Sequence, residues 1–174
     1  GVVGIIITGV TGVFGKALLM EYLKAIPTLR IKHQLQASTT YQFYLIGRNK
    51  DKLERVWSET SLIREELIGS NKDDIILTHM SLVFDFMLSS CDDLRDFWYN
   101  TVFPSLSSSH VNTVYAFMNA GDIHPLGYLS HIASTTPLSI QHAIHLNVTS
   151  FIISCGCMVE FCSNSTDDNG CGND

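Results

Sequence analysis

The stretch Thr8-Gly9-Val10-Thr11-Gly12-Val13-Phe14-Gly15 decides the fold, because it places three glycines between a strand pattern and a helix pattern. Leading into it, Val2 to Thr8 is a nearly continuous apolar run, typical of a parallel strand that is buried on both faces. After it, apolar residues recur at close to helical spacing from Phe14 to Ile26, and Pro27 is expected to end that helix. The sequence therefore begins with a strand, a glycine turn and a helix.

The rest of the chain continues this alternation. Further strands are predicted at Tyr41 to Ile46, Asp74 to Leu82 and Thr113 to Met118, and further helices at Lys50 to Leu67, Cys91 to Phe103 and Pro137 to Ser154. Ser90 is expected to cap the helix that begins at Cys91, and Pro104 to stop it. The pattern predicts an α/β fold, a Rossmann-like doubly wound parallel sheet that is truncated after the fourth strand and its following helix.

The amino-acid composition limits the kinds of molecule that the chain is expected to bind. The chain has 174 residues, 45% of them hydrophobic, which is enough for one domain with a buried core. A formal net charge of -6 argues against nucleic acid, which binds basic surfaces. The sequence has no uninterrupted run of 18 apolar residues, and its apolar start lacks a basic flank. We therefore expect a soluble, cytoplasmic protein that binds small molecules and no membrane.

The C-terminal segment differs from the rest of the chain. It holds four of the five cysteines, Cys155, Cys157, Cys162 and Cys171. Their spacing does not match the paired ligands of structural zinc sites, so reduced thiols and no metal are expected. Residues 163–174 are polar and show no apolar periodicity. We expect residues 1–154 to form the incomplete nucleotide-binding domain and residues 155–174 to form a disordered, cysteine-containing polar tail.

Two features of the strand ends point to a dinucleotide. A glycine-rich turn between a strand and a helix lets the backbone approach phosphate oxygens, and the helix N-terminus favours their negative charge. The alternative is a tight turn in an unrelated α/β fold. After the second strand, Arg48 stands where an arginine accommodates the 2′-phosphate of NADP and an acidic residue would select NAD. NADP(H) is therefore the favoured cofactor, unless Arg48 is merely a solvated residue.

Four pieces in order resemble the short-chain dehydrogenase/reductase family. They are the glycine turn, Gly47-Arg48-Asn49, Asn119-Ala120-Gly121 and Asn147, and the resemblance covers most of residues 2–154. Within the family, the residues look most like sepiapterin reductase and the benzil-type carbonyl reductases. The resemblance implies NADPH-dependent hydride transfer to a ketone or diketone, a small-molecule carbonyl substrate, and a homodimer for a full-length chain.

The resemblance also assigns roles to residues. It implies that the pyrophosphate is bound by Gly9, Val10, Thr11, Gly12, Val13, Phe14 and Gly15. Arg48 and Asn49 would bind the adenosine phosphate, and Ser81 and Leu82 the adenine. Asn119, Ala120 and Gly121 would contact the nicotinamide-side ribose. Asn147 would hold a water in the family's proton relay, the alternative being a hydrogen-bonded asparagine inside a helix.

The sequence departs from the family in three places. The middle glycine of the turn is Gly12, where the usual spacing puts a glycine at the position of Val13. Ser81 stands where an aspartate is usual. The catalytic serine after a fifth strand and the Tyr-x-x-x-Lys pair are both missing, since no tyrosine has a lysine four residues later.

Three readings of the function follow. In the first, the chain is the N-terminal part of an NADPH-dependent carbonyl reductase and is inactive alone. In the second, it is a non-catalytic NADP-binding protein or a truncated product. In the third, it belongs to the extended relatives that bind nucleotide sugars, which rests on the Gly12 spacing alone.

Overall fold

A computed structural model describes residues 1–32, 38–70, 75–121 and 137–167. The chain forms two compact units. The first unit is Gly1–Asp85 with Leu106–Ala120, and the second is Phe86–Ser105 with Gly121–Asp174. Residues 122–136 fall outside the described residues, as do Cys171 and the rest of residues 168–174.

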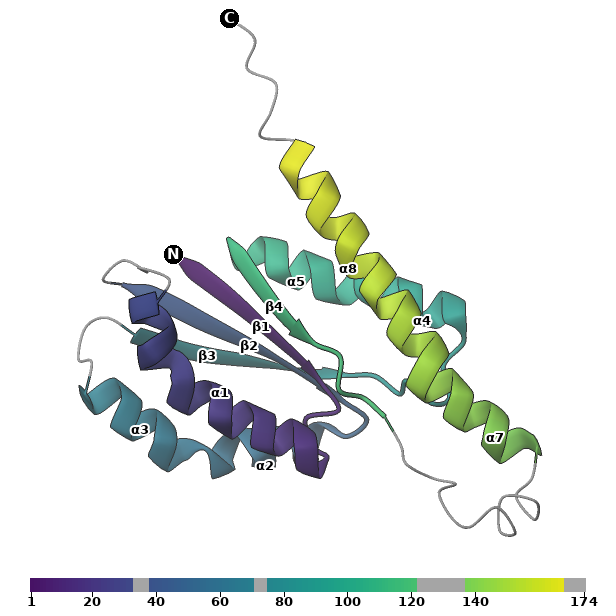
Figure 1. Ribbon diagram of the computed structural model, residues 1–174, viewed down its shortest axis with the longest axis horizontal. Coiled ribbons are helices and arrows are strands. Elements are labelled where there is room, and N and C mark those ends of the chain that lie inside the picture. The colour runs from purple at the N-terminus through teal and green to yellow at the C-terminus, as the bar shows by residue number, and fades with distance from the viewer. Residues whose placement is uncertain (33–37, 71–74, 122–136, 168–174) are drawn as a thin grey trace, which may run out of the picture. The chain divides into compact units, whose positions relative to one another are not determined.

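The first unit is built on a four-stranded parallel sheet (Figure 1). Its strands are β1 (Val2–Thr8), β2 (Thr39–Gly47), β3 (Ile75–Val83) and β4 (Thr113–Phe117), in the order β3-β2-β1-β4. Ile5 on β1 is in register with Phe43 on β2 and Tyr115 on β4. The predicted α/β, Rossmann-like parallel sheet is confirmed. All four strands point the same way, so their carboxyl ends meet at one edge, where ligands of such sheets bind.

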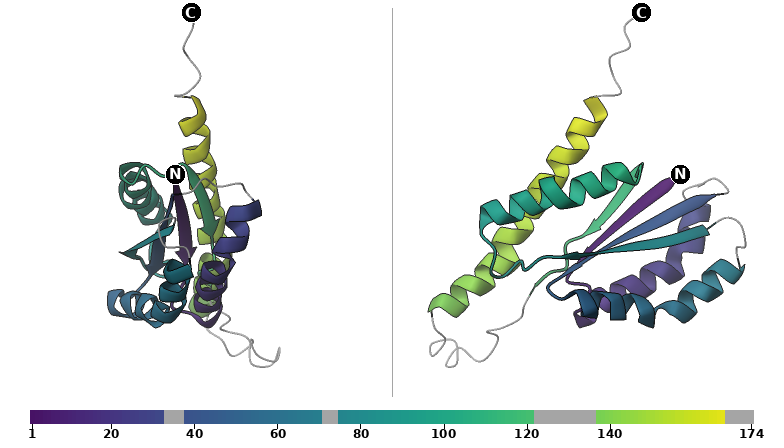
Figure 2. Two further views of the ribbon diagram at one scale, coloured as in Figure 1. Left: turned by 90° about the vertical axis from the view of Figure 1, so that its left-hand side faces the viewer. Right: turned by 180° about the vertical axis from the view of Figure 1, so that it is seen from behind.

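Three helices cover one face of this sheet. They are α1 (Val13–Lys32), α2 (Lys50–Glu59) and α3 (Ser61–Ser70), and Figures 1 and 2 show them on the same side of the strands. Right-handed crossovers from β1 to β2 to β3 require this placement. The core between helices and sheet includes Ile5, Leu19, Leu23 and Phe43, whose side chains are fully buried.

Two helix predictions in this unit were wrong. The first helix does not end at Pro27 but continues to Lys32, because the extension brings Leu29 against the core and this packing outweighs the loss of one backbone hydrogen bond. The predicted helix Lys50 to Leu67 is two helices that meet at Thr60. The buried Thr60 hydroxyl donates to the carbonyl oxygen of Trp57 at 2.7 Å and so closes α2.

The second unit is helical. It contains α4 (Cys91–Phe97), the π-helical turn η1 (Trp98–Val102) and the start of α5 (Phe103–Ser108), then α7 (Pro137–Ile144), the π-helical turn η2 (His145–Thr149) and α8 (Ser150–Asp167). Ser90 caps α4 as predicted, in a reciprocal capping box with Asp93. Pro104 does not stop the helix. The wider π-turn before it accommodates the missing N–H, since the Phe103 N–H donates back to the carbonyl oxygen of Trp98.

The long helix through α7, η2 and α8 corrects the predicted tail. It continues to Asp167, so residues 155–167 are helical where disorder was expected, because Met158 and Phe161 continue an apolar face. Met158 is buried, and Phe161 stacks on Phe103 with ring centroids 4.3 Å apart. Trp98 Nε1 also donates to Ser154 Oγ at 3.0 Å.

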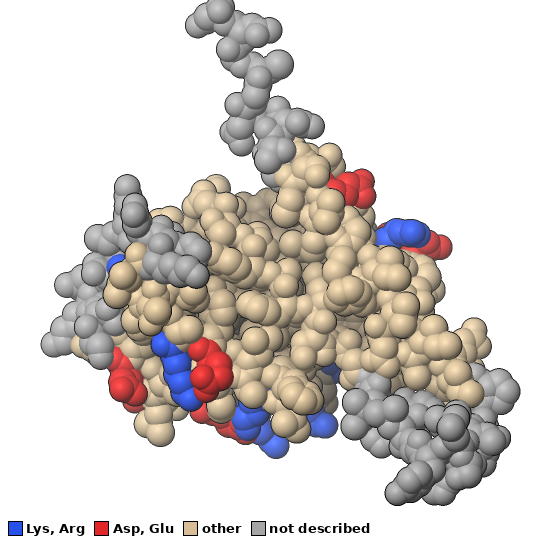
Figure 3. Space-filling model, in the orientation of Figure 1, with Lys and Arg blue, Asp and Glu red and all other residues tan. Residues whose placement is uncertain are grey.

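The same helix is unusually apolar. Among the described residues, Leu138–Asn164 is long and apolar enough to cross a membrane by length and composition, although such a helix is also found in protein cores. Glu160 is its single Asp, Glu, Lys or Arg residue. In Figure 3 the surface over α8 is accordingly almost free of charge, while charged side chains gather over the helices of the first unit.

The connection from α5 to β4 contains the one non-glycine residue with a positive φ among the described residues. His110 has a φ of 50° and is exposed. Its N–H donates to the carbonyl oxygen of Ser107 at 3.1 Å, and the Val111 N–H donates to that of Leu106 at 3.2 Å. This is the Schellman ending of a helix, in which the left-handed position favours glycine.

We predict that His110→Gly stabilises the protein by about 0.5–1 kcal/mol, because it relieves the left-handed backbone at an exposed position. Thermal or urea unfolding measures the change. The matched control is Ser107→Gly, an exposed position in right-handed helix that should be destabilised by about as much. A destabilised His110→Gly would contradict the prediction.

Candidate functional site

The turn between β1 and α1 is closed by its own backbone. The Gly9 N–H donates to the carbonyl oxygen of Ile46 at 2.9 Å, and the Gly12 N–H donates to that of Gly9 at 3.0 Å. Gly9 has a φ of 65°, which L side chains rarely adopt. Helix α1 starts at Val13, and the N–H groups of its first turn have no partner inside the helix. The turn therefore presents donors and a helix dipole to an anion.

This turn packs directly on the chain after β4. A Cβ on Gly9 would lie 2.8 Å from the Cα of Ala120, and a Cβ on Gly15 would lie 2.4 Å from the carbonyl oxygen of Gly9. The buried Thr8 hydroxyl oxygen accepts from the Ala120 N–H at 2.8 Å. The predicted pyrophosphate turn and the predicted Asn119-Ala120 segment are thus brought together, with backbone packed where a side chain would stand.

Thr8 was missed as a site residue. The sequence shows it only as the last residue of a strand, and its bond to Ala120 joins positions 112 residues apart. The single local signal is that it immediately precedes the first glycine of the turn.

The altered glycine spacing falls at a position that is less crowded than Gly9 or Gly15. At Gly12 an added Cβ would meet only the Gly9 carbonyl oxygen, at 3.3 Å. Val13, which stands in place of the usual glycine, is 86% exposed and points away from the fold. Phe14 is 80% exposed beside it. The departure therefore retains Gly9 and Gly15, the two positions of the turn where a Cβ would clash with backbone.

The end of β2 contributes a cation. Arg48 follows Gly47 and is exposed. Asn49 is the N-cap of α2, and its side-chain oxygen accepts from the Lys52 N–H at 2.9 Å. An added Cβ on Gly47 would lie 3.7 Å from the Thr11 hydroxyl, which places the glycine turn beside the start of the Arg48 segment. Arg48 is thus next to the turn, while the Asn49 oxygen is engaged in capping.

The two predicted adenine residues lie at the end of β3. The Ser81 hydroxyl oxygen is buried, and Leu82 is buried as well. The Phe84 N–H, just beyond the strand, donates to the carbonyl oxygen of Gly47 at 2.9 Å and fixes this strand end beside that of β2. Their side chains belong to the packed sheet, and a ligand at this edge would meet the backbone that follows them.

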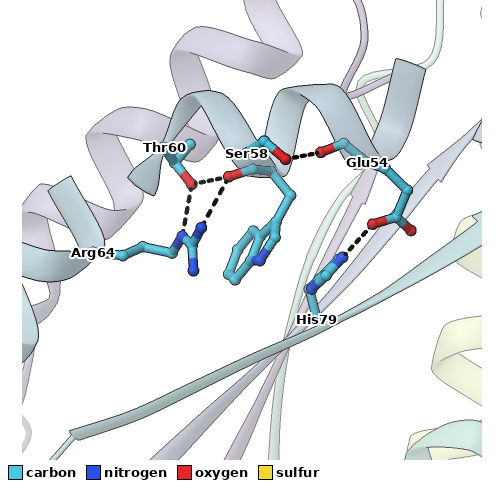
Figure 4. A network of polar contacts seen from close by, with 6 residues as sticks. Glu54, Ser58, Thr60, Arg64 and His79 are labelled. Atoms are coloured by element: carbon cyan, nitrogen blue, oxygen red, sulfur yellow. Dashed lines mark hydrogen bonds and ion pairs between the residues drawn. The ribbon is translucent and has the colours of Figure 1, made fainter. Parts of the chain in front are cut away.

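A polar network on α2, α3 and β3 lies beside these residues (Figure 4). Glu54 Oε2 lies 3.0 Å from His79 Nε2. The His79 contact, followed by the Ser81 hydroxyl, holds the pKa of the Glu54 carboxyl below its usual range. Neither Glu54 nor His79 stood out in the sequence, because they are joined only by the packing of α2 on β3.

The remaining predicted residues belong to the second unit. Gly121 follows Ala120, and Asn147 is exposed within η2. In this turn the Ser150 N–H donates to the carbonyl oxygen of His145, five residues back, and the Ser150 hydroxyl donates to that of Leu146. Such π-turns are frequent at functional sites, and here the irregular turn includes Asn147.

No family model and no curated protein matches the sequence of the chain. Several solved structures share its fold. One is yciK, an oxidoreductase from Escherichia coli, with a TM-score of 0.55 and 15% identity over 91% of this chain and 51% of that chain.

Two further neighbours were solved with nicotinamide cofactors. A proposed short-chain dehydrogenase from Escherichia coli CFT073, complexed with NADPH, gives a TM-score of 0.56 and 16% identity over 91% of this chain and 52% of that chain. Another from Shigella flexneri, complexed with NADP, gives a TM-score of 0.55 and 15% identity, again over 91% of this chain and 52% of that chain. The chain thus has the fold of these oxidoreductases and spans about half of their length.

We predict that Gly15→Ala removes the turn's ability to bind a dinucleotide and destabilises the first unit by about 1–3 kcal/mol, because the new methyl group meets backbone. The matched control, Gly12→Ala, should retain binding. Calorimetric titration with NADPH and urea unfolding measure the two effects. Equal behaviour of the two variants would contradict the geometry of the turn.

Proposed function

We propose that this chain is the dinucleotide-binding half of a short-chain dehydrogenase/reductase, an NADPH-dependent carbonyl reductase of the sepiapterin reductase and benzil reductase type. The whole protein would reduce a ketone or diketone, and this half would supply the cofactor site. The nicotinamide cofactors in two of the solved neighbours support the choice of ligand.

One observation carries the proposal. Gly9 and Gly15 let the turn pack backbone against backbone at the N-terminus of α1, where a Cβ at either position would lie within 3 Å of another part of the chain. A turn without side chains at these positions, combined with the free N–H groups and the dipole of the helix that follows, is what a pyrophosphate requires. It lies at the carboxyl ends of the parallel strands, between β1 and β4, where the strand order reverses. This is the expected place for a ligand of an open α/β sheet.

Each remaining site residue would then have a defined task. The first N–H groups of α1 donate to the pyrophosphate, and the Arg48 guanidinium donates to the 2′-phosphate. Asn119 and Ala120, held against the turn through Thr8, orient the nicotinamide-side ribose. Asn147 holds a water for proton transfer. NADPH, when bound, supplies the hydride for the carbonyl carbon.

The proton for the carbonyl oxygen needs another source. In the family a tyrosine with a lysine four residues later supplies it, and this sequence has no such pair. Tyr44 and Arg48 are the nearest match, and Tyr44 is fully buried in β2. The proposal therefore assigns binding to these residues and reduction to the whole protein.

The same observation supports a second candidate function. A chain with the glycine turn and no Tyr-x-x-x-Lys pair suits a non-catalytic NADP-binding protein. Turnover separates the two: oxidation of NADPH by this 174-residue chain in the presence of sepiapterin or a 1,2-diketone would exclude the second candidate.

The proposal extends to partners and location. A small carbonyl compound is the substrate, and the full-length protein is a cytoplasmic homodimer. The net charge of -6 supports a small-molecule partner over nucleic acid.

We predict that the chain binds NADPH more tightly than NADH and that Arg48→Ala raises the Kd for NADPH about tenfold or more while leaving that for NADH unchanged. The reason is loss of charge-assisted hydrogen bonds to the 2′-phosphate. Fluorescence titration measures both constants. The control is Arg55→Ala, at an exposed arginine on the helix that follows Arg48, and it should change neither constant. Equal affinity for both cofactors in the unaltered chain would overturn the cofactor choice.

A further inference from the structure

The Glu54 side chain is held against β3 by a residue of that strand. Its carboxylate oxygen Oε2 lies 3.0 Å from Nε2 of His79, so a helix residue is tied to a strand residue 25 positions later. The His79 ring stacks on Trp57 of α2, with centroids 4.5 Å apart and planes 21° apart. The imidazole thus touches α2 twice, through a polar edge and an aromatic face.

The orientation of His79 is fixed from the other side of the indole. The Arg64 guanidinium carbon lies 4.3 Å from the centroid of the Trp57 ring. Two groups this close to one centroid occupy opposite faces of the ring. Arg64 is itself held by Thr60 Oγ1 at 3.1 Å and by the carbonyl oxygen of Trp57 at 3.3 Å (Figure 4). Trp57 is buried, so the stacked side chains of Arg64, Trp57 and His79 hold the Glu54 carboxylate in place.

The Glu54 carboxylate places a negative charge near the start of α2. Its lowered pKa keeps it ionised at neutral pH. Glu54 is the fifth residue of α2, about 6 Å along the helix axis from Lys50, which also acts on it. Arg48 lies two residues before the helix begins. A full negative charge therefore stands six residues along the chain from Arg48, the cation that the proposed function gives to the 2′-phosphate.

We propose that His79 is a positioning residue for cofactor selection: it holds Glu54 against β3, so that Glu54 neither pairs with Arg48 nor repels a bound 2′-phosphate. This inference rests on the proposed function. Without the tie, the half-exposed Glu54 side chain is free to turn toward the start of α2. Pairing of Glu54 with Arg48, or repulsion between Glu54 and the phosphate, weakens the binding of a ligand that has a 2′-phosphate. The binding of a ligand that lacks the 2′-phosphate is largely unaffected.

The test compares 2′,5′-ADP with 5′-AMP by calorimetric titration, since these probes differ in the 2′-phosphate. Two variants of His79 separate its contacts. His79→Phe keeps an aromatic ring on Trp57 and loses the donor to Glu54, whereas His79→Gln keeps an amide donor and loses the stacked ring. We expect His79→Phe to lower the preference for 2′,5′-ADP about two- to fivefold, the Coulomb effect of one charge on a phosphate at 8–10 Å. His79→Gln should keep most of the preference.

The double variant gives the decisive comparison. Glu54→Gln alone should have the same preference for 2′,5′-ADP as the unaltered chain, or a higher one. The double variant Glu54→Gln with His79→Phe should have the same preference as Glu54→Gln alone. The loss in His79→Phe should also shrink in 0.5 M salt, which a purely structural defect would not do. A thermal melt of each variant checks folding.

Three results would overturn the inference alone: an unchanged preference in His79→Phe, no recovery in the double variant, or a larger loss in His79→Gln than in His79→Phe. If the unaltered chain shows no preference for 2′,5′-ADP over 5′-AMP, the proposed cofactor choice fails and the inference fails with it.

Discussion

The first unit depends on a backbone contact that excludes side chains. At Gly15 an added Cβ would stand 2.4 Å from the Gly9 carbonyl oxygen, and at Gly9 it would stand 2.8 Å from the Ala120 Cα. These contacts bring the end of β1, the start of α1 and the chain after β4 to one point. The N-terminus of α1 then faces the edge at which all the parallel strands end. The absence of side chains at Gly9 and Gly15 is therefore required both for the packing of the first unit and for the proposed binding of the pyrophosphate.

Local chemistry was enough to predict the parts of the fold that are local. Strand β1, the glycine turn and the Ser90 cap follow from residues close together in the chain, and each appears near its predicted position. The predicted ends at Pro27 and Pro104 were wrong because tertiary packing and a π-turn sustain both helices. Apolar positions such as Met158 likewise extend α8 into a segment whose composition is polar.

The candidate site shows the same division. Gly9, Gly15 and Arg48 could be found from sequence, because motif spacing places them at strand ends. Thr8 could not be recognised, since its bond to Ala120 depends on β1 and β4 being neighbours. The tie between Glu54 and His79 depends equally on α2 lying over β3. Residues that are proposed to contact a ligand can thus be found from a motif, whereas those that hold them in place depend on the topology.

We propose that the turn from Gly9 to Gly15 binds the pyrophosphate of NADP(H), and amide chemical shifts test this binding most directly. Addition of NADPH to ¹⁵N-labelled protein should move the backbone N–H resonances of Val13, Phe14 and Gly15 and that of Ala120, because donors to a phosphate and their packed neighbour change environment. Saturating NADPH that leaves these resonances in place, or that shifts only residues remote from the turn, would contradict the account.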